Sequence, residues 1–152
     1  MSEPDSDFAP VDALIRKALN DQGLFRHMGA EIVELSRGNA VVALAYRDEV
    51  AQHNGFFHGG AVGFLVDVAC AAAGGSALRQ PGSTVLTAEY KLNIVAPARR
   101  GRLVCRATVV KPGRSLIPVE AKVYAVGDNG TERLVAVGLA TMAVVTAERV
   151  AA

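Results

Sequence analysis

Three glycines, a histidine and an aspartate carry most of the chemical information in this chain, and all of them lie between Gln52 and Leu78. The stretch contains Gly55 and the run His58-Gly59-Gly60, and it continues as a long series of small and apolar residues whose one charge is Asp67. We interpret it as a loop that leads into a buried helix.

The two ends of this stretch predict complementary chemistry. The first turn of a helix has unpaired backbone N–H groups and partial positive charge, and glycines there let the carbonyl of a ligand come close. That arrangement suits an oxyanion. The carboxylate of Asp67 can take a proton from water or attack a carbonyl directly. Together they predict acyl transfer to water.

The distance between these groups predicts a second chain. At a rise of about 1.5 Å per residue, Asp67 lies roughly 12 Å along the helix axis from Gly59. The two groups therefore cannot serve one site within one chain. A two-fold dimer with antiparallel central helices would bring Asp67 of one subunit towards the helix start of the other, forming two equivalent composite sites.

The neighbours of Asp67 leave a structural alternative open. At helical spacing, one face of the predicted helix holds small residues and the adjacent face holds apolar ones. The first face leaves room for a ligand and the second fills a core. In the alternative, Asp67 is a structural carboxylate bonded to nearby backbone, and the glycines only permit close helix packing. The small residues are Gly60, Gly63, Ala71 and Gly74, and the apolar ones are Ala61, Phe64, Leu65, Val68 and Ala72.

Gly55, the run His58-Gly59-Gly60 and Asp67 resemble the signature of hotdog-fold acyl-CoA thioesterases of the phenylacetate-degradation (PaaI) type, within the 4-hydroxybenzoyl-CoA thioesterase superfamily. The similarity runs from about residue 29 to residue 145. It implies that Asp67 is the base or nucleophile and that the backbone N–H of Gly59 polarises the thioester carbonyl. It also implies a homodimer as the minimal unit, a homotetramer built as a dimer of dimers, and no metal or redox cofactor.

The resemblance assigns roles to three further residues near the motif. Six residues before His58 these enzymes often have Asn, whereas this chain has Gln52. Related 4-hydroxybenzoyl-CoA thioesterases place Gln there, so Gln52 is expected to contact the carbonyl or the water, with Asn54 as the alternative if the loop is shifted. Thr87 stands where relatives place a Ser or Thr that orients the attacking water, although a threonine in a strand is usually structural.

The remaining candidates are expected to bind the substrate. His58 is interpreted as shaping the loop or contacting the substrate rather than as a proton carrier. Gly60 and Phe64 are expected to line the acyl site, and core packing explains Phe64 equally well. Arg100 and Arg114 lie in turns, where basic residues are most often only solvated, but they could bind the phosphates of coenzyme A.

Composition restricts the class of protein. The chain has 152 residues, 51% of them apolar, and a net charge of +1. This is one domain's worth of sequence with no overall attraction to nucleic acid. The acidic, polar N-terminus has no signal-peptide pattern, and the run 61–78 is better explained as a buried helix than as a membrane span. Cys70 and Cys105 are isolated thiols, which indicates a reduced, cytoplasmic protein.

Periodicity predicts an α+β hotdog domain over residues 11–146, between a flexible segment 1–10 and a tail 147–152. A first helix is expected from Val11 to about Gly23, with Phe25 and Met28 in a following loop. An antiparallel sheet of five to six strands is then expected to wrap around the one long central helix. The predicted strands span 30–36, 40–46, 84–95, 102–111, 115–126 and 133–146.

The sequence thus favours an acyl-CoA thioesterase that acts on aromatic or medium-chain acyl groups. The alternative is a non-catalytic acyl-CoA-binding or ligand-sensing hotdog protein, which Asp67 disfavours because burying a carboxylate without a role is costly. Hotdog hydratases place a His five residues after the position of Asp67, where this chain has Ala72. We therefore do not expect hydratase activity.

Overall fold

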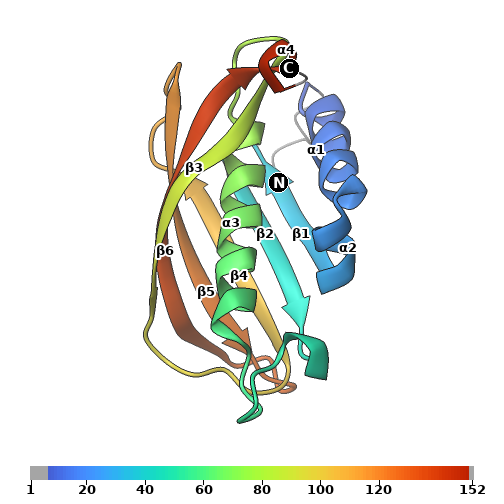
Figure 1. The fold of residues 1–152 in the computed structure, drawn as a ribbon, viewed down its shortest axis with the longest axis vertical. Helices are drawn as coiled ribbons and strands as arrows, with labels where there is room; N and C mark the ends of the chain where they lie inside the picture. The colour runs from blue at the N-terminus through green and yellow to red at the C-terminus, as the bar shows by residue number, and fades with distance from the viewer. Residues whose placement is uncertain (1–6, 151–152) are drawn as a thin grey trace.

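A curved sheet wrapped around one long helix dominates the computed structural model, which describes residues 7–150 (Figure 1). The six antiparallel strands are ordered β1-β2-β4-β5-β6-β3. The helices are α1 (Ala9–Asp21), α2 (Gly23–Met28), α3 (Gly59–Ser76) and α4 (Ala147–Val150), with a short 3-10 helix, η1 (Asp48–Val50). The strands are β1 (Ala30–Ser36), β2 (Asn39–Ala45), β3 (Ser83–Ile94), β4 (Arg102–Val109), β5 (Leu116–Val126) and β6 (Glu132–Thr146).

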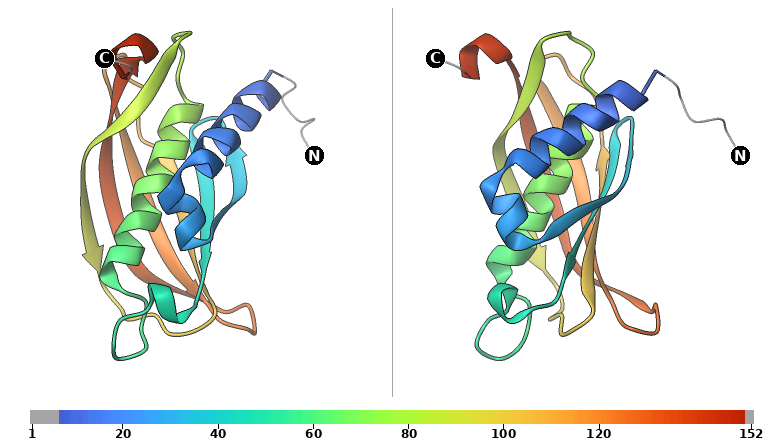
Figure 2. Two further views of the ribbon diagram at one scale, coloured as in Figure 1. Left: turned by 45° about the vertical axis from the view of Figure 1, so that its right-hand side comes forward. Right: turned by 90° about the vertical axis from the view of Figure 1, so that its right-hand side faces the viewer.

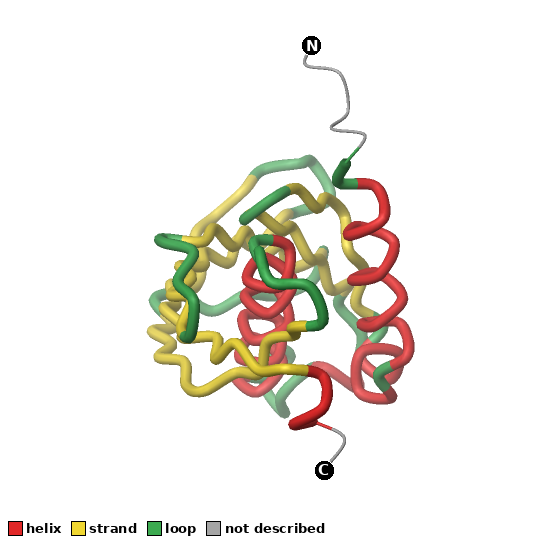
Figure 3. The backbone as a smooth tube through the Cα atoms, turned by 90° about the horizontal axis from the view of Figure 1, so that it is seen from above, coloured by secondary structure: helices red, strands yellow, loops and turns green. Residues whose placement is uncertain are grey.

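The central helix α3 fills the concave side of the sheet (Figure 3). By length and composition alone it could cross a membrane, but 67% of it is buried inside the domain, as expected of a core helix. Glycines bring it close to the strands. A Cβ on Gly74 would lie 2.9 Å from Met142 Cγ, and a Cβ on Gly138 of β6 would lie 3.0 Å from Val66 Cγ1. Larger residues at these positions would push the helix away from the sheet.

The strands beneath α3 follow the period of two that a half-buried sheet requires. In β5 the buried residues Ile117, Val119 and Ala121 alternate with outward-facing positions, among which Glu120 and Lys122 are exposed. The strand β3 differs because it is an edge strand with one neighbour, β6, and most of its residues are exposed. The concave face therefore supplies the core, and of the two edge strands, β1 and β3, the long strand β3 is largely exposed.

Both cysteines belong to this core. Cys70 and Cys105 are free and fully buried. Burial raises the pKa of the Cys70 thiol to about 12, with a smaller contribution from the nearby Asp67, and burial also raises the pKa of Cys105. Both thiols are therefore protonated near neutral pH and act as small apolar side chains.

The predicted architecture is confirmed, with corrections at the N-terminal side. Helix α1 begins at Ala9, two residues before the predicted start at Val11, and Phe8 is buried. The expected flexible segment 1–10 therefore extends too far along the chain. Residues 1–6 lie outside the described part. The prediction of a loop at Phe25 is wrong. The extended backbone of Gln22 ends α1, and α2 then begins at Gly23 and buries Phe25.

At the other end, residues 147–150 of the expected tail form the single turn α4, and residues 151–152 lie outside the described part.

Replacing Gly101 with alanine is expected to destabilise the fold strongly. Gly101 has φ +62°, and an added Cβ would lie 2.2 Å from the backbone oxygen of Val126. The left-handed conformation costs a non-glycine residue about 1–2 kcal/mol, and the overpacking adds a further ~1–3 kcal/mol. Gly130→Ala is the matched control, since Gly130 has φ +78° and nothing within 4 Å of its Cβ position. Urea unfolding that gives both variants the same loss of stability would contradict this interpretation.

Candidate active site

One stripe of α3 is left uncovered by the rest of the domain. Gly60 is exposed, and Phe64, Asp67, Ala71 and Gly75 are half-buried, whereas the other faces of the helix are largely buried. Helix α3 lies between β3 on one side and α1 with α2 on the other (Figures 1 and 2), and Phe64 of the stripe has its ring centroid 6.4 Å from that of Phe25 in α2. Asp67 is the one charged residue of α3 and lies near the middle of the stripe.

Asp67 is held by a residue of β3. The hydroxyl of Thr87 donates a hydrogen bond of 2.7 Å to Oδ1 of Asp67, and it also lies 3.7 Å from the sulfur of Met142. The contact joins two residues of one chain. It fixes the orientation of the carboxylate and leaves its second oxygen free to accept a proton from a water molecule on the open stripe.

The start of α3 presents one free backbone donor. His58 is the N-cap, and its Nδ1 accepts a hydrogen bond of 2.8 Å from the N–H of Gly60. Ala61 and Val62 donate to the backbone oxygen of His58. Among the described residues, the N–H of the exposed Gly59 makes no hydrogen bond. Gly59 is thus the donor available to an oxyanion, and His58 sets the direction of that donor by capping the helix.

The loop before α3 is a tight turn built around Gln52. The Gln52 backbone accepts from Gly55 N–H at 2.9 Å, and its Oε1 accepts from Asn54 N–H at 2.5 Å. The backbone N–H of Gln52 donates to Phe56 O at 2.8 Å, whereas its side-chain nitrogen, Nε2, makes no hydrogen bond to any described residue. Gln52 lines a cavity of about 420 Å³ together with Phe56, Phe57, Ile94, Val95, Ala96 and Pro97. Asn54 is exposed, and its Nδ2 lies 3.2 Å from Nε2 of His53.

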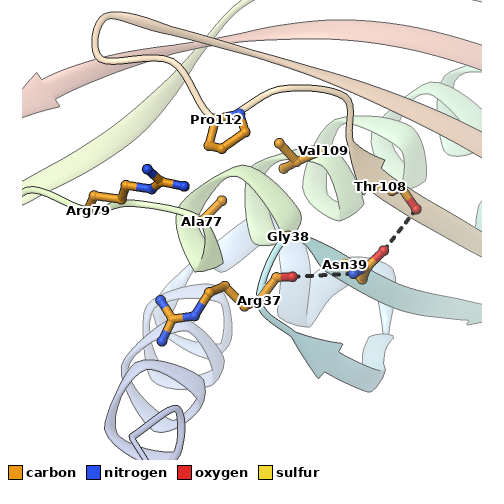
Figure 4. A pocket seen from close by; sticks show the side chains of 8 residues that line it. All are labelled: Arg37, Gly38, Asn39, Ala77, Arg79, Thr108, Val109 and Pro112. Carbon is orange, nitrogen blue, oxygen red and sulfur yellow. Dashed lines mark hydrogen bonds between the residues drawn. The ribbon is translucent and has the colours of Figure 1, made fainter. Parts of the chain in front are cut away.

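The two candidate arginines lie at opposite ends of the domain. Arg100 precedes β4 and Arg114 follows it, so a strand of eight residues, about 26 Å long, separates them. Arg114 lines a cavity of about 90 Å³ at the C-terminal end of α3, together with Arg79 and Gly113. A neighbouring cavity of about 220 Å³ places Arg37 and Arg79 on either side of Ala77 (Figure 4).

The structure therefore brings some predicted residues together and keeps others apart. Thr87 reaches Asp67, and Gln52 lies in the loop that precedes Gly59 and His58. Gly59 and Asp67 remain far apart along one helix, as the spacing predicts. The sequence does not single out Arg79 and Arg37, because neither belongs to a motif. They line one cavity because the C-terminal end of α3 lies next to the turn between β1 and β2.

Comparisons with known proteins identify the family and the fold. A family model described as "Thioesterase superfamily" matches residues 54–132. A 1,4-dihydroxy-2-naphthoyl-CoA hydrolase of Listeria monocytogenes is 31% identical over 80% of this chain and 95% of its own length. A crystal structure of a thioesterase family protein from Silicibacter pomeroyi superposes with a TM-score of 0.85 at 34% identity, covering 90% of this chain and 98% of that one.

The fold extends to more distant structures. The PaaI protein from the phenylacetic acid degradation operon of E. coli superposes with a TM-score of 0.77 at 18% identity, covering 89% of this chain and 93% of that one. At this identity the likeness shows the fold alone.

His58→Ala is expected to lower the free energy of unfolding by about 1 kcal/mol, because the N-cap acceptor of the Gly60 N–H is lost. His58→Asn should retain most of that stability, since an asparagine oxygen can accept the same hydrogen bond. Chemical denaturation of the three proteins checks both values. Equal losses in the two variants would show that the ring of His58, and not its acceptor atom, supports the helix start.

Proposed function

Because this chain belongs to the thioesterase superfamily, whose members hydrolyse thioesters, we propose that it hydrolyses an aromatic or medium-chain acyl-CoA in a site shared by two copies of the chain. The single observation that carries the proposal is the position of Asp67. It is the only charged residue of α3, and it lies on the uncovered stripe with its orientation fixed by Thr87.

The proposed reaction uses two groups of this chain, the carboxylate of Asp67 and the backbone N–H of Gly59. The free oxygen of Asp67 takes a proton from water while the water oxygen attacks the thioester carbonyl carbon. The N–H of Gly59 of the partner subunit stabilises the negative charge that develops on the carbonyl oxygen. Collapse of the tetrahedral intermediate breaks the C–S bond, and the proton held by Asp67 passes to the thiolate of CoA. A direct attack by Asp67 would form an anhydride that water then hydrolyses.

Two features support a dimer as the catalytic unit. The first is the uncovered stripe of α3, where Gly60, Ala71 and Gly75 permit close approach of a second helix. The second is β3, a twelve-residue edge strand. It exposes the apolar residues Leu86 and Ile94 by 50% each, and Val95, directly after the strand, is exposed by 58%. A long edge strand is a template for pairing with another chain, and pairing of β3 with β3 about a two-fold axis would bring the two stripes together.

The assembly is proposed to extend to a homotetramer in the cytoplasm. On the convex face of the sheet Leu116 and Leu139 are exposed by 54% and 53%. Apolar side chains on the convex face, away from the proposed dimer stripe, support a second interface between dimers.

The phosphates of CoA are proposed to bind at the C-terminal end of α3, where Arg79 and Arg114 line one cavity. Ala77 at this end is ten residues from Asp67, roughly 15 Å along the helix, which an extended pantetheine arm can span. Arg100 lies at the other end of β4 and can join this site only from the partner subunit.

Asp67→Asn is expected to lower kcat about 10²–10⁴-fold, the usual contribution of a general base, while binding of acyl-CoA is retained. Release of free thiol from a panel of aromatic and medium-chain acyl-CoAs measures turnover, and calorimetric titration measures binding. A wild-type protein that binds these compounds but hydrolyses none of them would instead support the ligand-sensing alternative.

Gly59→Pro tests the shared site, because it removes the N–H that is proposed to stabilise the oxyanion. Proline is tolerated at the first position of a helix, and His58 has the extended backbone (φ −64°, ψ 141°) that a residue before proline prefers. The expected loss in kcat is about 10²–10³-fold.

Mixing the two inactive variants should restore activity. If each site takes Asp67 from one chain and Gly59 from the other, a heterodimer of Asp67→Asn and Gly59→Pro has one intact site. Random exchange of equal amounts then gives about a quarter of the wild-type activity. Verified subunit exchange without recovered activity would show that each site lies within one chain.

A further inference from the structure

A second side chain of β3 lies over α3 beside Asp67. The hydroxyl oxygen of Tyr90 is 3.1 Å from the position that a Cβ on Gly63 would occupy, and Gly63 is one helical turn before Asp67. Tyr90 therefore reaches across the helix at a point where the helix has no side chain of its own. A side chain at residue 63 would force that hydroxyl to move by a few tenths of an ångström.

An irregularity in β3 puts Tyr90 on the same face as Thr87. Residues three apart in a regular strand point to opposite faces. The pairing of β3 with β6 shifts register between Thr87 and Glu89, and this bulge adds the extra residue that turns Tyr90 back towards α3. Both polar side chains thus border the stripe that carries Asp67.

The hydroxyl of Tyr90 has no protein partner among the described residues. It takes part in no hydrogen bond, and the residue is 42% exposed. Apart from Thr87, which is bonded to Asp67, two further residues of β3 near α3 are apolar: Ile94 Cδ1 is 3.5 Å from the Cβ position of Gly59, and Val85 Cγ2 is 3.8 Å from that of Gly75. In the proposed dimer the partner subunit covers this side of the stripe and removes water from it. The Tyr90 hydroxyl then needs another polar group as its hydrogen-bond partner.

Charge indicates which part of the substrate lies next to Tyr90. The basic residues Arg79 and Arg114 mark the C-terminal end of α3 as the side of the CoA phosphates. The acyl group then extends from Asp67 in the other direction, towards Gly63 and Gly60. Phe64 borders this part of the stripe from the α2 side, where its ring centroid is 6.4 Å from that of Phe25. Tyr90 borders it from β3.

We propose that Tyr90 is a specificity-determining residue of the acyl site, whose hydroxyl bonds to a polar substituent on an aromatic acyl group. This inference rests on the proposed function. Gly63 precedes Asp67 by about 6 Å along the helix, which is close to the distance from a carbonyl carbon across a benzene ring to a para substituent. A ring hydroxyl at that position meets Tyr90, whereas an unsubstituted ring leaves the Tyr90 hydroxyl unpaired.

The test compares benzoyl-CoA with 4-hydroxybenzoyl-CoA in the wild type and in Tyr90→Phe. The variant is expected to lower kcat/KM for the hydroxylated substrate about 10-fold, the loss of roughly one hydrogen bond, and to leave kcat/KM for benzoyl-CoA within about 2-fold. Tyr124→Phe is the matched control, because Tyr124 lies on the convex face, away from the proposed acyl site. There Cζ of Arg106 lies 4.9 Å from the centroid of its ring. Equal changes for the two substrates in Tyr90→Phe, or no change, would overturn the proposal.

Measurements of acyl-CoA binding distinguish a failure of the Tyr90 proposal from a failure of the proposed hydrolytic reaction. In the Asp67→Asn background, Tyr90→Phe should weaken binding of 4-hydroxybenzoyl-CoA relative to benzoyl-CoA by a similar factor. A wild type that turns over no acyl-CoA refutes the hydrolytic function, while the ratio of the two dissociation constants still decides the role of Tyr90. Turnover of straight-chain acyl-CoAs alone, with no binding of either aromatic compound, would overturn the role of Tyr90 and leave the hydrolase in place.

Discussion

The burial of α3 against the concave face of the sheet is the constraint on which the rest of this structure depends. Small residues let the helix approach the strands closely, as Gly74 does against Met142 and Gly138 against Val66. The helix can then be apolar on every side that the sheet covers. The one carboxylate of the helix, that of Asp67, lies on the side that the sheet does not cover, between β3 and α2.

The rigid, buried helix also keeps two polar groups apart, the backbone N–H of Gly59 and the carboxylate of Asp67. The start of α3 leaves an N–H group of Gly59 unpaired because His58 caps the next one. The middle of the helix carries Asp67, oriented by Thr87 from the adjacent strand. A rigid helix keeps these groups about two turns apart. A reaction that needs both groups at one carbonyl therefore has to draw them from two helices, and the uncovered stripe and the open edge of β3 provide surfaces where a second chain can bind.

The edge strand β3 also links Asp67 to the proposed acyl site. Thr87 and Tyr90 lie on the same side of β3 because of the register shift between Thr87 and Glu89. A bulge next to a functional side chain re-aims it without changing the strand's position in the sheet. In this chain the bulge allows one strand to hold the carboxylate with Thr87 and to place Tyr90 over Gly63, beside the proposed acyl site.

Sequence patterns were most informative where a local rule applies. The strand periods, the turn residues and the run His58-Gly59-Gly60 followed by Asp67 predicted the sheet, the central helix and the two polar groups along it. Local rules failed between Asp21 and Gly29. The first helix ends close to Gly23, as predicted, but a second helix of six residues follows at once and buries Phe25 in the core, and so short a segment carries no periodic pattern of its own.

Residue order alone predicts that a lone carboxylate and a glycine-rich helix start occupy one helix at a fixed separation, because helical rise depends only on the number of residues between them. The side chains that lie beside these two groups follow only from the folded chain. Thr87 is paired with Asp67, Tyr90 lies over Gly63, and Arg79 lies near Arg114, because a curved sheet and a strand bulge bring together residues that no sequence spacing connects.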